Sequence, residues 1–150
     1  MADSDVIPGV ARLPMATIPV LQALVLADQV YVDARSGKKV IAGTFNRLWT
    51  SKFPASLGRK TWAYICLTEV QGSVSVELRY VDLKSNEVLL RNEPFTVKAD
   101  DPLNSTEMVV AVPPLPMPHE GVYAFELYAA EEMLGALRIT VARPKAGSTQ

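Results

Sequence analysis

Cysteine and histidine are nearly missing from this chain of 150 residues, which has one of each, Cys66 and His119. A single cysteine cannot form a disulfide within the chain, and this favours, weakly, a reducing compartment. A single histidine excludes a metal site built from several histidines, so we predict no metal site and no cofactor. Because Cys66 stands among aromatic and aliphatic residues, we expect a small buried hydrophobe and not the nucleophile of a Cys66–His119 pair.

An excess of charge of either sign is also missing, since 15 basic and 16 acidic residues leave a net charge of -1. A protein that binds nucleic acid needs a basic surface to neutralise phosphates, so nucleic acid is not an expected partner. The mostly apolar stretch 13–27 is too short to span a bilayer, so no membrane is expected either. A cleaved signal peptide is the alternative for this stretch. However, Asp3 and Asp5 precede it where such signals carry basic residues, and a buried first strand is the better interpretation.

The common catalytic signatures are missing as well. The sequence contains no phosphate-binding loop, no dinucleotide-binding glycine motif and no nucleophile elbow. His119 follows Pro118, and we expect it to be a turn residue that is exposed or caps a backbone group. We therefore predict no catalytic residues, and an enzyme ranks third among the functional classes that the sequence allows.

The apolar residues that are present follow the period of β-strands. Within residues 73–83, Val74, Val76, Leu78 and Tyr80 alternate with polar residues, as in an antiparallel strand with one buried face. Turn-forming residues separate about eight such segments at the spacing of β-sandwiches and barrels. The expected strands are residues 19–33, 39–49, 60–70, 73–83, 88–97, 108–112, 121–130 and 133–141, with a tight hairpin at 71–72 and another at 131–132.

These segments predict one all-β domain over residues 19–142. A mobile N-terminal arm is expected at 1–18 and a disordered C-terminal tail at 143–150. A chain of this length buries enough surface to fold without a metal or a disulfide. The first strand is expected to bend near residues 27–28, and Gly43 suggests a bulge or a close approach of the backbone.

Residues 119–125, His-Glu-Gly-Val-Tyr-Ala-Phe, resemble the start of strand F in immunoglobulin domains. In those domains a tyrosine two residues before the second cysteine forms a corner with the upstream backbone. Tyr123 has the place of that tyrosine, Gly121 makes the tight turn and Phe125 replaces the cysteine. The resemblance implies an immunoglobulin-like antiparallel β-sandwich of about eight strands. It also implies that Tyr123 is buried, with its hydroxyl bonded to the backbone a few residues upstream.

A broader pattern resembles a family of small bacterial β-sandwich proteins of unknown function. The resemblance covers roughly residues 20–141. It implies a bacterial, cytoplasmic protein and provides no known catalytic residue. The stretches that carry it are residues 24–28, 37–38, 43–47, 53–54, 121–127 and 134–137.

Trp49, Lys52 and Phe53 lie in or beside a loop predicted for residues 50–58, where solvent exposure is the norm. The favoured interpretation is that Phe53 closes one end of the sandwich, since large aromatic side chains are mostly buried. The functional alternative makes all three residues candidate contacts for a protein partner, because aromatic anchors dominate interface hot spots.

The sequence favours a non-catalytic β-sandwich that works through contacts with a protein partner or a second copy, as a subunit or accessory of a larger assembly. The alternative is a carbohydrate-binding module, in which at least two of Trp49, Trp62 and Tyr128 would have to share an exposed face. The last strand has Arg138 as its only charge within residues 133–141, and the first strand has none before residue 27. At a sheet edge either strand would invite strand addition, unless it is interior or covered.

Overall fold

The structure, a computed structural model, describes residues 18–145. The predicted arm lies outside the described residues except for Ile18, and the predicted tail lies outside them beyond Lys145. Between these limits all regular structure is β-strand. Residues 18–145 contain no helix with the length and apolar character needed to cross a membrane.

Twelve strands form three sheets within the described residues. The four-stranded sheet has the order β2 (Lys39–Thr44), β1 (Val20–Val32), β5 (Thr61–Thr68), β9 (Thr106–Val112). The six-stranded sheet has the order β3 (Arg47–Trp49), β12 (Glu132–Ala142), β11 (Gly121–Ala129), β6 (Gly72–Asp82), β7 (Glu87–Arg91), and β8 (Phe95–Ala99) also pairs with β6. A small sheet joins β4 (Ala55–Leu57) and β10 (Leu115–Met117). Adjacent strands are antiparallel except β3 and β12, which are parallel.

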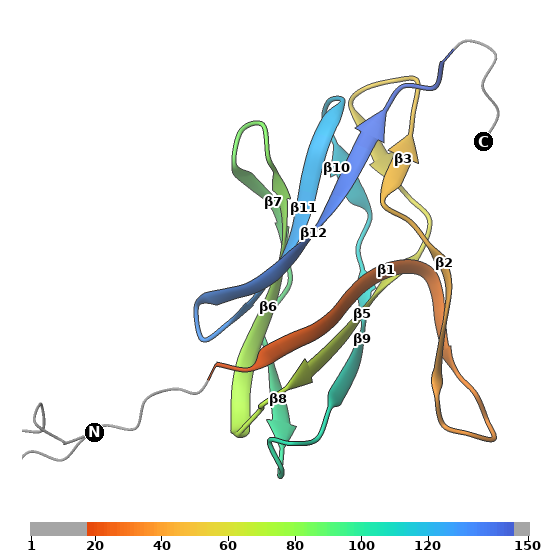
Figure 1. Cartoon of the computed structure of the whole chain (residues 1–150). Coiled ribbons are helices and arrows are strands. Elements are labelled where there is room, and N and C mark those ends of the chain that lie inside the picture. The colour runs from red at the N-terminus through yellow and green to blue at the C-terminus, as the bar shows by residue number, and fades with distance from the viewer. Residues whose placement is uncertain (1–17, 146–150) are drawn as a thin grey trace, which may run out of the picture.

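The hydrophobic core lies between the two larger sheets, which face each other (Figure 1). Ile65 and Leu67 on β5 belong to the same buried cluster as Tyr80 on β6 and Phe125 on β11. Along β6 the side chains of Val76, Leu78 and Tyr80 are buried, which confirms the alternation predicted from the sequence. Inward residues at every second position therefore define the interior face of each sheet.

Residues 39–49 form two strands in different sheets instead of the single strand predicted. The break follows Gly43, whose φ is +75°, a conformation that L-residues rarely adopt. A Cβ atom at Gly43 would lie 2.7 Å from Oδ2 of Asp28, so the expected close approach is confirmed. The chain then joins the six-stranded sheet as β3, where Arg47 pairs with Thr140 at the end of β12.

Residues 88–97 also form two strands, because Asn92 interrupts the pairing with β6. The side-chain Oδ1 of Asn92 accepts a hydrogen bond from the backbone N–H of Leu78 at 2.6 Å. The backbone N–H of Asn92 donates to the carbonyl of Leu78 at 3.2 Å. Pro94 follows and has no N–H for a ladder, so pairing resumes only in β8. Together with β4 and β10, which form inside predicted connections, these breaks raise the number of strands above the predicted eight.

The hairpin predicted at residues 71–72 is wrong, because β5 and β6 belong to different sheets. The chain crosses between the sheets through Glu69 and Gly72, whose φ values are 60° and 68°. Left-handed residues occur both in tight hairpins and in other reversals of direction, so the local signal does not distinguish them. The other predicted hairpin is confirmed, because β11 and β12 pair along their length. Its tip is Ala130 and Glu131, one residue earlier than the predicted 131–132.

Strand β1 bends where it leaves β5, and its second half forms a hairpin with β2 that extends away from the core (Figure 1). The bend lies where the sequence predicts it, since Ala27 is the last residue of β1 paired with β5. Nζ of Lys39 on β2 lies 3.2 Å from Oε1 of Glu107 on β9. The hydroxyl of Tyr64 donates to the same carboxylate. These contacts fix the hairpin to the outer face of the four-stranded sheet.

We predict that Gly43→Ala lowers the free energy of unfolding more than Gly37→Ala does. Both glycines have positive φ, 75° and 72°, so each substitution costs about 1–2 kcal/mol of backbone strain. Only at Gly43 does the new Cβ also meet a neighbour, the side chain of Asp28, whereas nothing lies within 4 Å at Gly37. Urea unfolding of both variants tests this, and equal losses would contradict the close approach.

Candidate protein-contact site

Tyr123 on β11 is fully buried, and its hydroxyl bonds to the backbone four residues upstream. The hydroxyl donates to the carbonyl of His119 at 2.6 Å and accepts from the N–H of His119 at 3.2 Å. Both features agree with the prediction for Tyr123. Gly121 has a φ of 152°, and a Cβ there would lie 3.3 Å from the His119 ring, so a larger residue would crowd this corner. Phe125 is buried in the core, where its ring lies 5.1 Å from that of Tyr80.

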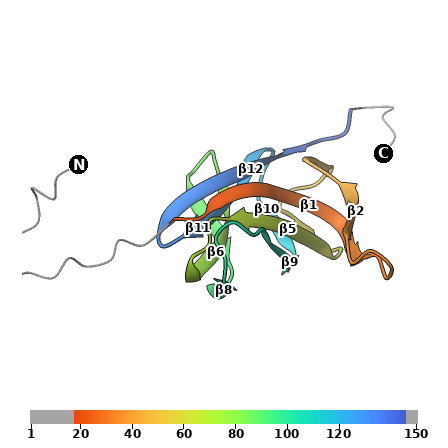
Figure 2. The same ribbon diagram turned by 60° about the horizontal axis from the view of Figure 1, so that its bottom comes forward.

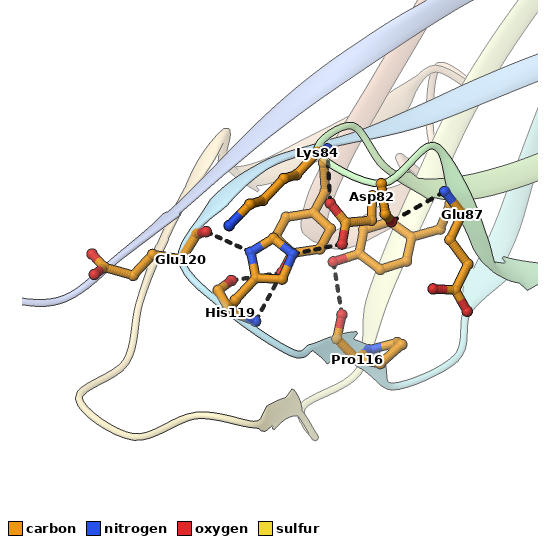
Figure 3. A network of polar contacts seen from close by, with 9 residues as sticks. Asp82, Lys84, Glu87, Pro116, His119 and Glu120 are labelled. Atoms are coloured by element: carbon orange, nitrogen blue, oxygen red, sulfur yellow. Dashed lines mark hydrogen bonds and ion pairs between the residues drawn. The ribbon is translucent and has the colours of Figure 1, made fainter.

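The imidazole of His119 has a hydrogen-bond acceptor at each ring nitrogen (Figure 3). Nε2 lies 2.6 Å from Oδ2 of Asp82 at the end of β6, and Nδ1 lies 2.6 Å from the carbonyl oxygen of Glu120. Both acceptors are satisfied only when the ring carries two protons. In the doubly protonated form His119 links Asp82 to the carbonyl of Glu120, and neither nitrogen is then free to accept a proton from a substrate.

The protonation states of His119 and Asp82 support each other. The hydrogen bond to the carbonyl of Glu120, and then that to Asp82, raise the pKa of His119 above its ordinary value of 6.5. Burial alone would raise the pKa of Asp82. The hydrogen bonds from His119 and from the backbone N–H of Lys84 outweigh burial, and the pKa lies below its ordinary value. Each shift favours the charged form of its group, so the two side chains form an ionic contact when His119 is protonated.

Cys66 is buried, as predicted, but it lies on the outer side of β5, outside the core cluster. Its Sγ lies 3.5 Å from Oε1 of Gln22 on β1. His119 bonds instead to Asp82 of the six-stranded sheet. The structure thus does not bring Cys66 and His119 together as a catalytic pair.

The predicted contact residues Trp49, Lys52 and Phe53 differ in their exposure and contacts. Trp49 is 42% exposed, and the guanidinium of Arg47 lies 5.4 Å from its ring. Lys52 is exposed, whereas Phe53 is half-buried and packs against the core. The guanidinium of Arg143 lies 4.8 Å from the Phe53 ring and donates to the carbonyl of Ser51 at 2.6 Å. This packing agrees with the favoured interpretation, in which Phe53 closes one end of the core, and of the three residues it leaves only Trp49 and Lys52 accessible.

Most of β12 has no strand beside it on the side away from β11, and we call this its open side. β3 pairs only with Thr140, Val141 and Ala142, so the preceding part of β12 has β11 on one side and no strand on the other. β1 is in a similar position, because β2 pairs with it only from Ala27 onward. Arg138 is the only charged residue in the open part of β12 after Glu132.

The open parts of β1 and β12 lie next to each other, as both ribbon views show (Figure 2). Leu21 of β1 packs onto Gly135 of β12, where any Cβ would lie 2.6 Å from Cδ2 of Leu21. A hollow of about 250 Å³ follows beside them, with Leu24, Phe45 and Leu137 among its lining residues. Two adjacent strand edges and this hollow, whose lining also includes Thr44 and Asn46, therefore form one continuous surface.

Two sets of polar contacts were not predicted from the sequence. Asp82 ends an alternating strand and is 3% exposed, a burial that an aspartate tolerates only with partners. Asp82 continues the alternate positions of Val76, Leu78 and Tyr80, so the sequence pattern itself indicates that its side chain faces inward. The second group joins Arg79, Glu77 and Tyr128 on the outer face of the six-stranded sheet, where the Arg79 guanidinium lies 3.8 Å from the Tyr128 ring.

The described residues form an all-β domain of two larger sheets and one small sheet, in which β12 and β1 have open edges. Residues 22–142 match the model of a family of unknown function, DUF6941. The chain belongs to this family, and the matched range extends from Gln22 in β1 to the end of β12. A comparison with curated proteins finds no match.

We predict that Tyr123→Phe lowers the free energy of unfolding by about 1 kcal/mol or more, because the hydroxyl makes two hydrogen bonds to the backbone of His119 and one such bond contributes about 1 kcal/mol net. Tyr31→Phe is the matched control, because Tyr31 is 52% exposed and should lose nothing measurable. Chemical denaturation of both variants measures the difference. An unchanged stability for Tyr123→Phe would show that the corner contributes no net stability.

We predict that the stability of the native protein falls as pH rises above 6.5. The pKa of His119 is raised in the folded state, so its contribution is complete below 6.5 and is lost as pH passes the folded pKa. The pKa of Asp82 is lowered, so its contribution holds above 3.8 and is lost as pH falls through its folded pKa. Thermal unfolding of wild type and His119→Gln across this range measures the effect. Parallel profiles above pH 6.5 would contradict the proposed charge on His119.

Proposed function

We propose that this chain is a non-catalytic, immunoglobulin-like β-sandwich that acts through protein–protein contacts as a subunit or accessory of a larger assembly. The observation that carries this proposal is the open side of β12, adjacent to the open part of β1. Backbone N–H and C=O groups at an open edge are satisfied by a further strand, and natural proteins protect edges that have no partner. Here the open segment carries a single charge, Arg138, and no proline.

The chemistry of the corner at His119 supports a non-catalytic role. General acid–base catalysis needs a group that can exchange a proton with a substrate. Asp82 and the carbonyl of Glu120 occupy both nitrogens of His119, and Asp82 is itself buried. The arrangement stabilises the end of β6 against the start of β11.

Carbohydrate binding finds less support in the positions of the aromatic residues. Trp62 alternates with core residues on β5, so it faces the outside of the four-stranded sheet. Trp49 and Tyr128 belong to the six-stranded sheet, but they pair with Ala142 and Met133, so about 25 Å of strand separates them. Cationic groups of Arg47, Lys60 and Arg79 lie over the three rings, which leaves no shared stacking surface.

The bacterial, cytoplasmic setting implied by the sequence resemblance belongs to the same proposal. A reducing compartment suits a chain whose single cysteine is free and buried. The exposed Trp49 and Lys52 at the other end of β12 would provide a second contact for a larger partner.

Affinity purification of the tagged chain from its native cells, with mass spectrometry, tests this function. We expect the wild type to recover a second copy or a recurrent protein, and Ala136→Lys to recover less, because a lysine guards an edge strand against pairing. Ala34→Lys is the matched control: it makes the same change in an exposed turn and should recover as much as wild type. A wild-type chain that stays alone, and that binds a glycan on an array, would overturn the proposal.

A further inference from the structure

We infer that the partner at the open side of β12 is a second copy of this chain, which pairs its own β12 antiparallel to the first across a two-fold axis at Leu137. The inference rests on the protein-contact function proposed above and specifies its partner. The contact would join two six-stranded sheets into one continuous sheet.

The hydrogen bonds made by β3 identify the backbone groups that face the open side. The N–H of Thr140 donates to the carbonyl of Asn46 at 2.9 Å, and the carbonyl of Ala142 accepts from the N–H of Thr50 at 3.1 Å. Backbone groups alternate in direction along a strand, so those of Arg138 and Ala136 point to the same side, away from β11. In the described chain no strand pairs with them there.

The limits of the open segment fix the register of the pairing. At its C-terminal end the open segment stops at Thr140, where β3 begins to pair with β12. At its N-terminal end it stops at Leu134, where a bulge shifts the pairing with β11 from Gly135 to Met133 and bends the strand. Residues 135–139 remain, with Leu137 at their centre. An antiparallel copy centred there places Ala136 opposite Arg138 of the second copy, and each such pair exchanges both of its outward hydrogen bonds.

The side chains in this register are complementary. Glu126 on β11 pairs with Ala136, and Ala124 pairs with Arg138. The row across the joined sheets therefore reads Glu126, Ala136, Arg138 of the second copy, and then Ala124 of the second copy. Neighbouring strands are about 5 Å apart, so the long Arg138 side chain can cross the small Ala136 and reach Glu126. Within residues 18–145 of one chain, Arg138 has no ion-pair partner.

The opposite face of the segment offers a hollow that can receive a leucine side chain of the second copy. Leu137 lines the hollow of about 250 Å³ together with Leu24 and Phe45. Leu137 of the second copy would lie directly opposite Leu137, on the same side of the joined sheet, and would enter this hollow. An isologous contact of this kind buries the same patch on both copies and closes as a dimer. A net charge of -1 gives no general repulsion between the two copies.

A charge-exchange series measured by sedimentation equilibrium tests the inference. Wild type should form a dimer. Ala136→Lys should weaken dimerisation about tenfold or more, because the new lysine faces Arg138 of the other copy. Arg138→Glu should weaken it as well, because Glu126 loses its partner. The double variant Ala136→Lys/Arg138→Glu should restore dimerisation, since opposite charges then face each other. Circular dichroism confirms that each variant is folded, and Ala34→Lys again serves as the control.

Disulfide trapping tests the register separately, in chains that also carry Cys66→Ala. Chains with Ala136→Cys and chains with Arg138→Cys should form a covalent dimer when mixed and mildly oxidised, and neither should do so alone. A wild-type monomer at high concentration would overturn the inference, even if affinity purification recovers another protein. A dimer whose stability is unchanged by the charge exchange, and which is not trapped by the cysteine pair, would have its contact elsewhere and would also overturn the inference. That outcome would not contradict the proposed protein-contact function.

Discussion

Backbone pairing along β12 is the interaction on which the rest of the structure depends. This strand pairs with β11 over its whole length and holds β3 at its end. It also contacts β1 of the facing sheet, where Gly135 leaves room for Leu21. Because β3 covers only the end of β12, the structure that joins the sheets also leaves backbone groups open. The same strand thus explains the cohesion of the domain and provides the edge at which we propose that a second copy binds.

A second constraint acts at the end of β6, where a buried carboxylate has to be satisfied. Asp82 accepts hydrogen bonds from His119 and from the N–H of Lys84, and His119 is held by the carbonyl of Glu120. Tyr123 closes the corner through the backbone of His119. These contacts use the only histidine of the chain to stabilise the fold, which is consistent with the non-catalytic role that we propose.

Much of the fold follows from local patterns in the sequence. The alternation in β6, the hairpin at Ala130 and Glu131, and the corner at Tyr123 depend on neighbouring residues, and all three are present. The pairing of strands that are distant in the sequence was harder to predict. Gly72 has the backbone conformation of a hairpin turn, yet it carries the chain between sheets, a choice made by the core on both sides. The contact of Asp82 with His119 joins residues far apart in the chain, and no spacing in the sequence predicts it.

Amide hydrogen exchange along β12, followed by NMR as a function of protein concentration, tests the central claim most directly. The N–H groups of Leu137 and Ile139 face β11 and should be protected at every concentration. The N–H groups of Ala136 and Arg138 face the open side, so they should exchange quickly in dilute solution and become protected as copies pair. Protection of Ala136 and Arg138 in dilute solution, or free exchange at the highest concentration, would contradict this account.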